Sequence, residues 1–286
     1  MPSKSFSNLG AHVSIAGGFD RAIDRALSVG CEVMQIFVKN NRQWFAPPLG
    51  KTSSQSFLGH PKRFQIKSVF AHSSYLINLG AQGEVRQNSI RALNEEIQRA
   101  EQLQLPFIVL HPGAHVGAGL EKGLQRIVRS LDEVIEATKH SKICISLETT
   151  AGQGTTIGSE FEHLSEILGK VKVPERFNVC VDTAHLFAAG YSIHEEKGYI
   201  KTFQRFDELI GLKRIAAFHL NDSKTPYGSK VDRHEHIGKG YIGLKTFEWL
   251  LNDKRFFKVP KVLETPKSDD LHEDRENLQI LRQLLH

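Results

Sequence analysis

Short apolar segments recur along the chain, and most are followed by a stretch with helical spacing. The segments are rich in Val, Ile, Leu and Phe, which is typical of buried parallel strands. They cover residues 9–15, 32–38, 66–72, 107–111, 142–148, 177–182, 215–219 and 259–264. Apolar positions three and four residues apart predict helices between them. These helices are expected at 19–29, 84–103, 120–138, 160–168, 201–210, 244–251 and near the C-terminus through Leu281.

This alternation predicts an α/β fold, a (β/α)8 TIM barrel with parallel strands. The length of 286 residues suits such a barrel, which needs about 250 residues. No Gly/Ser-rich linker or change of composition divides the chain, so we expect one domain over residues 1–286. Residues 1–8 are expected to form a short irregular segment. The loop 39–48 should lack regular structure because it ends on Pro47 and Pro48.

The composition indicates a soluble globular protein, with 40% hydrophobic and 24% charged residues. No apolar run approaches the roughly 20 residues of a membrane span. The first ten residues lack the apolar core of a secretory signal, so we expect the cytoplasm and no membrane. Cys31, Cys144 and Cys180 are scattered and odd in number. They are expected to be reduced thiols that form neither disulfides nor a metal site.

The charge of the chain is mildly basic. The formal net charge is +5 and the pI is about 9.0. Such an excess permits a polyanionic partner. It is too small to require a nucleic acid.

The ends of the predicted strands carry side chains that bind metal ions. Six successive strands, from the third to the eighth, end on His72, His111, Glu148, Asp182, His219 and Glu264. The carboxyl ends of barrel strands converge on one face, where active sites lie. A single histidine at a strand end is more commonly a core residue. Six such endings in succession predict a metal site on the C-terminal face of the strands.

Three further candidates lie close to these endings. His185 follows Asp182 by three residues, on the turn that leaves the strand. Asp232 and His234 are two residues apart, so extended backbone would direct them to the same side. The nine residues provide five imidazoles, four carboxylates and no thiolate, which suits Zn²⁺, with Mn²⁺ or Fe²⁺ as possible substitutes. Nine ligands suit three ions, although the spacing leaves their number open.

Nine segments of the chain resemble the endonuclease IV family, in order over residues 9–284. They are GAHVSIAGG (10–18), KNNRQW (39–44), HSSYLINL (72–79), HPGAH (111–115), ETTAGQG (148–154), DTAHLFAAGY (182–191), FHLNDSK (218–224), GSKVDRHEHIGKG (228–240) and LET (263–265). That family is similar in fold to xylose isomerases. It cleaves DNA at abasic sites through three zinc ions.

The resemblance implies a distribution of the nine ligands over three ions. The first ion would be held by His72, His111 and Glu148. Glu148 would bridge to a second ion, held also by Asp182, His219 and Glu264. The third ion would be held by His185, Asp232 and His234. The implied reaction is hydrolysis 5′ to the abasic sugar of double-stranded DNA, leaving a 3′-hydroxyl and a 5′-deoxyribose phosphate. Removal of 3′-blocking groups would follow the same chemistry, and Glu148 would assist deprotonation of the attacking water.

The resemblance also implies contacts with DNA and a monomeric protein. Arg42, Gln43, Tyr75 and Leu76 match positions that enter the duplex and fill the gap left by a flipped abasic nucleotide, which costs less to flip than a paired base. Basic residues of the same loops are expected to contact phosphates, namely Lys39, Lys224, Lys230, Arg233 and Lys239. Two departures from the family pattern are Ser73, where some members carry Asp, and Thr149, where some carry Asn. The serine is expected to weaken the orientation of His72.

Two other hypotheses remain open from the sequence. The first is a metal-dependent sugar isomerase or epimerase of the same barrel type, which would need fewer metals and no DNA-facing side chains. The second is a DNA- or metal-binding protein without catalysis, which the complete ligand set disfavours. His12, near the end of the first strand, either orients a ligand or packs in the core.

Overall fold

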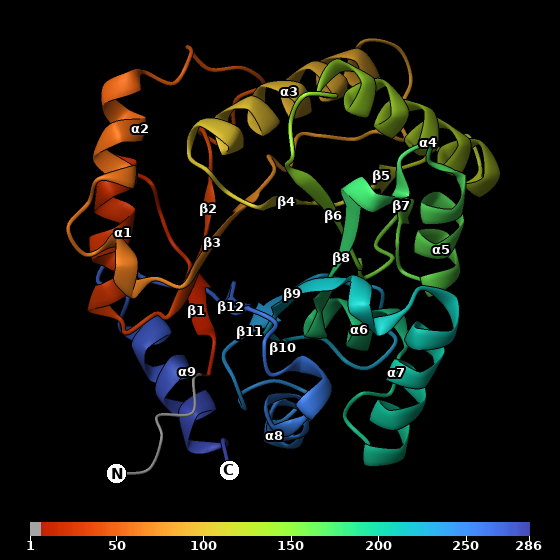
Figure 1. Ribbon diagram of the computed structural model, residues 1–286. Helices are drawn as coiled ribbons and strands as arrows, with labels where there is room; N and C mark the ends of the chain where they lie inside the picture. Colours follow the sequence, from red (N-terminus) through yellow and green to blue (C-terminus); the bar gives the residue numbers. More distant parts are fainter. Residues whose placement is uncertain (1–6) are drawn as a thin grey trace.

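The computed structural model describes residues 7–286, in which eight parallel strands form a closed barrel. Helices surround the barrel on its outside (Figure 1). The strands follow the order β1-β12-β9-β8-β6-β4-β3-β2 around the barrel. They are β1 (Leu9–His12), β2 (Val33–Phe37), β3 (Ser68–His72), β4 (Phe107–Leu110), β6 (Cys144–Glu148), β8 (Phe177–Asp182), β9 (Ile215–His219) and β12 (Lys261–Leu263). The predicted TIM barrel is confirmed. The expected irregular segment 1–8 lies outside the described residues except for Ser7 and Asn8, which lack regular structure.

The helices follow the predicted pattern with three corrections. They are α1 (Phe19–Ser28), α2 (Lys51–Leu58), α3 (Gly83–Gln102), α4 (Leu120–Ala137), α5 (Phe161–Lys170), α6 (Thr183–Ala189), α7 (Glu196–Leu209), α8 (Leu244–Asn252) and α9 (His272–Gln283). Helices α2 and α6 were not among the predicted ones, and α7 begins at Glu196 instead of Lys201. Almost every residue of α6 is buried, so it has no polar face to give a helical spacing.

Two of the six predicted strand ends are displaced by one residue. Strand β4 ends at Leu110, and His111 is the first residue beyond it. Pro112 follows, and a proline has no N–H to continue the ladder. Strand β12 ends at Leu263, because the N–H of Glu264 donates to Oδ1 of Asn221 at 2.8 Å instead of to a strand carbonyl.

The strand residues alternate between two apolar layers. One layer lies between strands and helices, and the other is a compact cluster of Val33, Phe70, Phe107, Val109, Cys180, Ala217 and Val262. Since side chains alternate along a strand, the residue two positions after a member of this cluster points to the same side. His72 follows Phe70 in this way, Asp182 follows Cys180, and Glu264 follows Val262. The alternation therefore directs the strand-end side chains toward one another.

Two short antiparallel pairs lie outside the barrel, in loops that follow its strands. Strand β5 (Gly113–Ala114) pairs with β7 (Thr156–Ile157), and β10 (Asp222–Ser223) pairs with β11 (His234–Glu235). Asp222 is buried and accepts hydrogen bonds from the N–H groups of Ser223, Gly238 and Ile242. A Cβ at Gly240 would lie 2.3 Å from the carbonyl oxygen of Ser223, so the loop closes tightly on this carboxylate. The loop that carries Asp232 and His234 is thereby fixed to the end of β9.

The cysteines form no disulfide among the described residues. All three are free, and Cys31 and Cys180 are buried. Burial raises the pKa of both buried thiols to about 12, so they are not reactive thiolates at neutral pH. Among residues 7–286, no helix is long and apolar enough to cross a membrane.

Candidate metal centre

The structure brings the nine predicted ligands into one continuous cluster at the carboxyl ends of the strands. Within this cluster, three groups of side chains have ligand atoms within 4.8 Å of one another. The groups are His72, His111 and Glu148; then Glu148, Asp182, His219 and Glu264; then Asp182, His185 and His234. Two carboxylates are shared between groups. Three cation positions side by side fit this arrangement.

Glu148 occupies the middle of the cluster and is fully buried. Its Oε2 lies 3.2 Å from Nε2 of His72 and 3.1 Å from Nε2 of His111. Its Oε1 lies 3.2 Å from Nδ1 of His185 and 3.0 Å from Nδ1 of His219. Burial raises the pKa of Glu148, but His219 and His111 outweigh it and lower the pKa well below the usual range. The carboxylate is therefore ionised at neutral pH.

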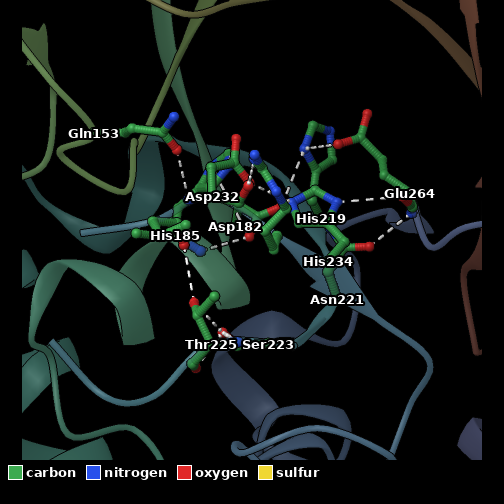
Figure 2. A network of polar contacts seen from close by, with 12 residues as sticks. Gln153, Asp182, His185, His219, Asn221, Ser223, Thr225, Asp232, His234 and Glu264 are labelled. Atoms are coloured by element: carbon green, nitrogen blue, oxygen red, sulfur yellow. Dashed lines mark hydrogen bonds and ion pairs between the residues drawn. The ribbon is translucent and has the colours of Figure 1, made fainter. Parts of the chain in front are cut away.

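Asp232 reaches the cluster from the loop between β10 and β11. Its Oδ2 lies 3.1 Å from Nε2 of His185, and its Oδ1 lies 3.3 Å from Nε2 of His234 (Figure 2). Oδ2 of Asp182 lies 3.7 Å from Nε2 of His234 and 3.8 Å from Nδ1 of His219. Asp232 thus lies beside His185 and His234, and Asp182 approaches both His234 of this group and His219 of the second group.

The donor set fits divalent cations. Nε2 of His185 and Nε2 of His234 are buried and face the carboxylate of Asp232 at 3.1 and 3.3 Å, so a cation between these atoms would have ligands on both sides. Burial lowers the pKa of His185 and His219, but the surrounding carboxylates raise it well above the ordinary value. The site therefore favours positive charge strongly. Imidazoles and carboxylates without thiolates suit zinc or a similar borderline ion.

Backbone carbonyls orient three of the imidazoles. Nδ1 of His72 donates to the Ser73 carbonyl at 2.7 Å, and Nδ1 of His185 donates to the Thr149 carbonyl at 2.8 Å. Nδ1 of His234 donates to the Glu264 carbonyl at 3.2 Å. Because a carbonyl only accepts, each Nδ1 carries a proton, and in the neutral ring Nε2 has the lone pair that can bind a cation. Since the partner of His72 is a backbone oxygen, the serine side chain at position 73 is not needed for its orientation.

Two amide side chains connect the ligands to one another, and sequence reasoning missed both. Gln35 of β2 donates to Oε1 of Glu264 at 2.6 Å, and its Oε1 accepts from Nε2 of His219 at 2.8 Å. Asn221 donates to Oδ2 of Asp182 at 2.7 Å and accepts from the Glu264 N–H (Figure 2). The spacing held a signal for Gln35, which follows Val33 by two residues and so points into the same layer.

His12 lies against Glu264. Its Nδ1 is 3.3 Å from Oε1 of Glu264 and accepts from Nε2 of Gln35 at 2.8 Å. Burial lowers the pKa of His12 to about 4, so the ring is neutral. Because this nitrogen accepts from Gln35, which also donates to Glu264, the structure supports the hypothesis that His12 orients a candidate ligand, acting through the amide of Gln35.

The side chains predicted to face DNA are exposed or half-buried, with one exception. Arg42, Gln43, Lys230 and Arg233 are exposed, and Tyr75 is 58% exposed with its ring 5.2 Å from that of His72. The remaining predicted residues are Leu76, which is half-buried, and Lys224 and Lys239, which are exposed.

Lys39 does not have the place predicted for it. It is only 5% exposed, and its Nζ lies 2.9 Å from Oε1 of Glu96. An ammonium buried in an ion pair is not available to a phosphate. The predicted DNA contact of Lys39 is therefore wrong for this structure.

Two neighbouring pockets open at the cluster. The first has a volume of about 580 Å³, and its lining includes His72, His111, His185, Asp232 and His234. The second has about 620 Å³, and its lining includes His12, Phe37 and Asn40. Tyr75 and Glu264 line both pockets. The candidate ligands thus face a space large enough for a sugar-phosphate group.

Comparison with known proteins identifies the family. Residues 23–284 match the model of the xylose isomerase-like TIM barrels. A probable endonuclease 4 of Chloroflexus aurantiacus is 47% identical over 277 residues, covering 96% of this chain and 97% of the relative. The chain belongs to the endonuclease IV family. A probable endonuclease 4 of Geobacter sp. strain M21 is 46% identical, covering 97% of this chain and 98% of the relative.

Solved structures agree with the membership in the endonuclease IV family. The crystal structure of endonuclease IV from Thermus thermophilus superposes with a TM-score of 0.85 at 31% identity, covering 96% of this chain and 98% of that one. A D-tagatose 3-epimerase-like protein superposes with a TM-score of 0.72 at 18% identity, covering 96% of both chains. The second likeness shows the shared barrel fold alone. The resemblance noted in the sequence is confirmed.

Proposed function

We propose that this protein is a DNA-repair endonuclease that hydrolyses the phosphodiester 5′ to an abasic site. The products would be a 3′-hydroxyl and a 5′-deoxyribose phosphate. The observation that carries the proposal is the cluster of eight candidate ligands around Glu148, with Asp232 beside His185 and His234, in a chain 47% identical to a probable endonuclease 4. The same chemistry would remove 3′-blocking groups from double-stranded DNA. The protein would act in the cytoplasm, in association with DNA.

The cluster would hold about three zinc ions. His72, His111 and Glu148 would hold one, and Glu148, Asp182, His219 and Glu264 would hold the second. His185, Asp232 and His234 would hold the third, and Mn²⁺ or Fe²⁺ could substitute. When bound, such ions neutralise a phosphate, lower the pKa of water and stabilise a departing oxygen.

We assign to Glu148 the role of assisting deprotonation of the attacking water. It is ionised, because four imidazoles surround its two oxygens. It is fully buried, so bulk water does not compete for the carboxylate. Gln35 and Asn221 would keep Glu264 and Asp182 in place while the substrate binds.

The loops around the first pocket would bind the damaged duplex. Arg42, Gln43, Tyr75 and Leu76 would fill the gap left by the flipped abasic nucleotide and offset part of the lost stacking. Their exposure makes them available to DNA, except for Leu76, which is half-buried. Phosphates on both sides would contact exposed basic residues, namely Lys224, Lys230, Arg233 and Lys239.

The sugar isomerase hypothesis is disfavoured by the third group of ligands. His185, Asp232 and His234 form a complete set beside the other two groups, whereas an isomerase would need fewer metals. The likeness to the epimerase-like protein rests on 18% identity and shows the fold alone. The hypothesis of a DNA- or metal-binding protein without catalysis is disfavoured as well, because such a protein would not need all nine candidate ligands.

The test is incision of a duplex that carries one tetrahydrofuran abasic analogue. We expect the zinc-loaded protein to cut 5′ to the analogue, to leave an end that a DNA polymerase extends, and to spare the intact duplex. Glu148→Gln should lower the incision rate about 100-fold or more, because changes around metal ligands alone cost 10–100-fold. The control is Glu133→Gln, which removes a carboxylate from the exposed face of α4.

Three outcomes would contradict the proposal. They are no incision by protein with metal bound, equal cutting of the intact duplex, and undiminished incision by Glu148→Gln. Metal analysis of the same preparations gives the zinc content, which we expect to be about three per chain.

A further inference from the structure

Helix α3 lies behind the two loops that carry the predicted gap-filling residues. We call residues 38–47 and 73–77 the recognition loops; the first follows β2 and the second follows β3. Three charged residues of α3, namely Glu95, Glu96 and Arg99, contact these loops. Arg99 follows Glu95 by four positions and Glu96 by three, so the three side chains lie on adjacent turns of the helix.

Glu96 connects both recognition loops through one buried carboxylate. Its Oε1 lies 2.9 Å from Nζ of Lys39, and both side chains are at most 2% exposed. Its Oε2 accepts from the N–H of Ser74 at 3.1 Å. Lys39 donates in turn to the carbonyl of Gln43 at 2.5 Å. One ion pair therefore reaches the residue next to Arg42 in the first loop and the residue next to Tyr75 in the second.

Further hydrogen bonds fix the flanks of the first loop. Oγ of Ser74 donates to the carbonyl of Asn41 at 2.7 Å, which joins the two loops directly. Glu95 accepts from the N–H of Ala46 at 3.1 Å, and Arg99 donates to the carbonyls of Val38 and Pro47. The loop has no regular structure of its own, so these contacts define its path.

Stability alone is a weak reason for this ion pair. Removing two charges from water is costly, and buried pairs are commonly replaced by apolar side chains without loss of stability. An exposed lysine beside a DNA-binding site could bind phosphates, but Lys39 is buried and cannot. The geometry that the pair imposes on the loops is the better reason for it.

We propose that Lys39 and Glu96 are positioning residues that hold the two recognition loops in one relative arrangement for the abasic gap. This inference rests on the proposed function, because it takes the loops to bind DNA. Gap-filling side chains from two different loops must enter the same space in the duplex. Arg42 and Gln43 are exposed, so packing does little to place them, whereas one side of the Tyr75 ring packs against Phe37 and His72. Their placement depends on the backbone that Glu96 and Lys39 hold.

The experiment compares Lys39→Met, Glu96→Gln and the double variant with the parent. Each single variant leaves one partner buried without its counterpart and should lower the melting temperature, whereas the double variant should recover most of it. Affinity for the abasic duplex should fall about 10- to 100-fold in all three, because small misplacements have effects of this size. Turnover at saturating DNA and the zinc content should stay within about twofold.

A second readout follows the first loop without DNA. Trp44 is half-buried in this loop, and the other tryptophan of the chain, Trp249, lies in α8. In a Trp249→Phe background, acrylamide should quench Trp44 more strongly in the three variants than in the parent. The control is Asp253→Asn, which breaks contacts with Tyr199 and Arg255 away from the loops. It should lower stability without changing Trp44 quenching or affinity.

The outcomes separate this inference from the proposed function. A parent protein that does not incise the abasic duplex would remove the proposed function. A double variant that binds the abasic duplex as tightly as the parent would overturn the positioning role. Unchanged quenching of Trp44 in the variants would overturn it as well, whether or not the parent incises DNA.

Discussion

Amide side chains hold the charged groups of the cluster in their relative places. Gln35 contacts Glu264 with its nitrogen and His219 with its oxygen. An amide carries no charge, so it can orient a carboxylate and an imidazole together without competing for a cation. Partners of this kind fix the direction in which a ligand presents its lone pair. Metal retention should therefore depend on residues that do not touch the metal.

Replacing Gln35 tests this dependence. We expect Gln35→Leu to bind zinc about 10- to 100-fold more weakly, because Glu264 and His219 both lose a hydrogen-bond partner. Titration of the loaded protein with a chelator gives the affinity. Gln55→Leu, on the exposed side of α2, is the control and should retain the parent affinity. Equal zinc affinity in Gln35→Leu and the parent would show that the amide has no such role.

The sequence predicted that the candidate ligands lie close together, but it did not reveal the residues that orient them. The nine candidate ligands could be found because strand ends converge in a barrel, which makes a linear spacing a spatial one. Gln35 and Asn221 are not ligand types, so the same search passed over them. The burial of Lys39 could not be foreseen, because its partner Glu96 lies on a helix far along the chain.

At the scale of elements, the loop after β9 is organised by one carboxylate. Asp222 accepts three backbone N–H groups, which fold residues 223–242 back onto the end of β9. The loop carries Asp232 and His234 of the third ligand group. It also carries four exposed basic residues, namely Lys224, Lys230, Arg233 and Lys239. The path of the loop therefore determines the third group.

Asp222→Asn should loosen this loop. In the variant, one carboxylate oxygen becomes an NH₂ group, which donates and cannot accept. The backbone N–H groups that this oxygen accepted from are then buried without a partner. We expect faster trypsin cleavage at the four basic residues and a loss of incision of about tenfold or more. Mass spectrometry of the digest locates the cleavage, and Asp207→Asn on α7 is the control. Cleavage at the parent rate would mean that other contacts hold the loop.

Element boundaries were predictable where the chain shows amphipathic spacing. Helices α3 and α4 have one apolar face each and were found within a residue of their bounds. Helix α6 is buried nearly all round, and Asp182 caps it by accepting from the N–H of His185 at 2.8 Å. The expected turn at His185 is thus the first turn of a helix. Because α6 is buried on nearly all sides, its sequence lacks the amphipathic spacing that predicts a helix.

At the scale of the whole molecule, the amino end of the barrel contains a buried lysine with no part in the site. Lys261 is the first residue of β12, and Glu264 lies just beyond the other end of this strand. Its Nζ donates to the carbonyls of Phe256 and Val259 at 2.7 and 2.9 Å. Burial lowers the pKa of Lys261 from 10.5 to about 8.

This lysine should make the free energy of unfolding depend on pH. The unfolded chain binds a proton at Lys261 up to about pH 10.5, but the folded protein loses it near pH 8, so its contribution to stability rises between these values. The rise amounts to about 3 kcal/mol. Urea unfolding at pH 7.5 and pH 10 measures it.

The variant Lys261→Met isolates this contribution from the buried thiols, which act in the opposite direction above pH 9. We expect the parent to gain stability relative to the variant as the pH rises from 7.5 to 10. The unfolding free energy of Lys261→Met minus that of the parent should therefore fall over this range. Zinc content and incision at pH 7.5 should be unchanged, because the residue lies at the amino end of its strand. A difference that does not vary with pH would contradict the lowered pKa.

The contacts of Glu148 also have a consequence for how the protein matures. The carboxylate contacts residues that precede it by 76 positions and follow it by 71, and Glu264 contacts His12 across 252 positions. Such distant contacts form late, after the entropy of closing long loops has been overcome. A chain cut short before β12 lacks Glu264 and the strand that closes the barrel between β1 and β9. Recovery of incision after denaturation would therefore report complete closure of the barrel, and would lag behind the return of helices.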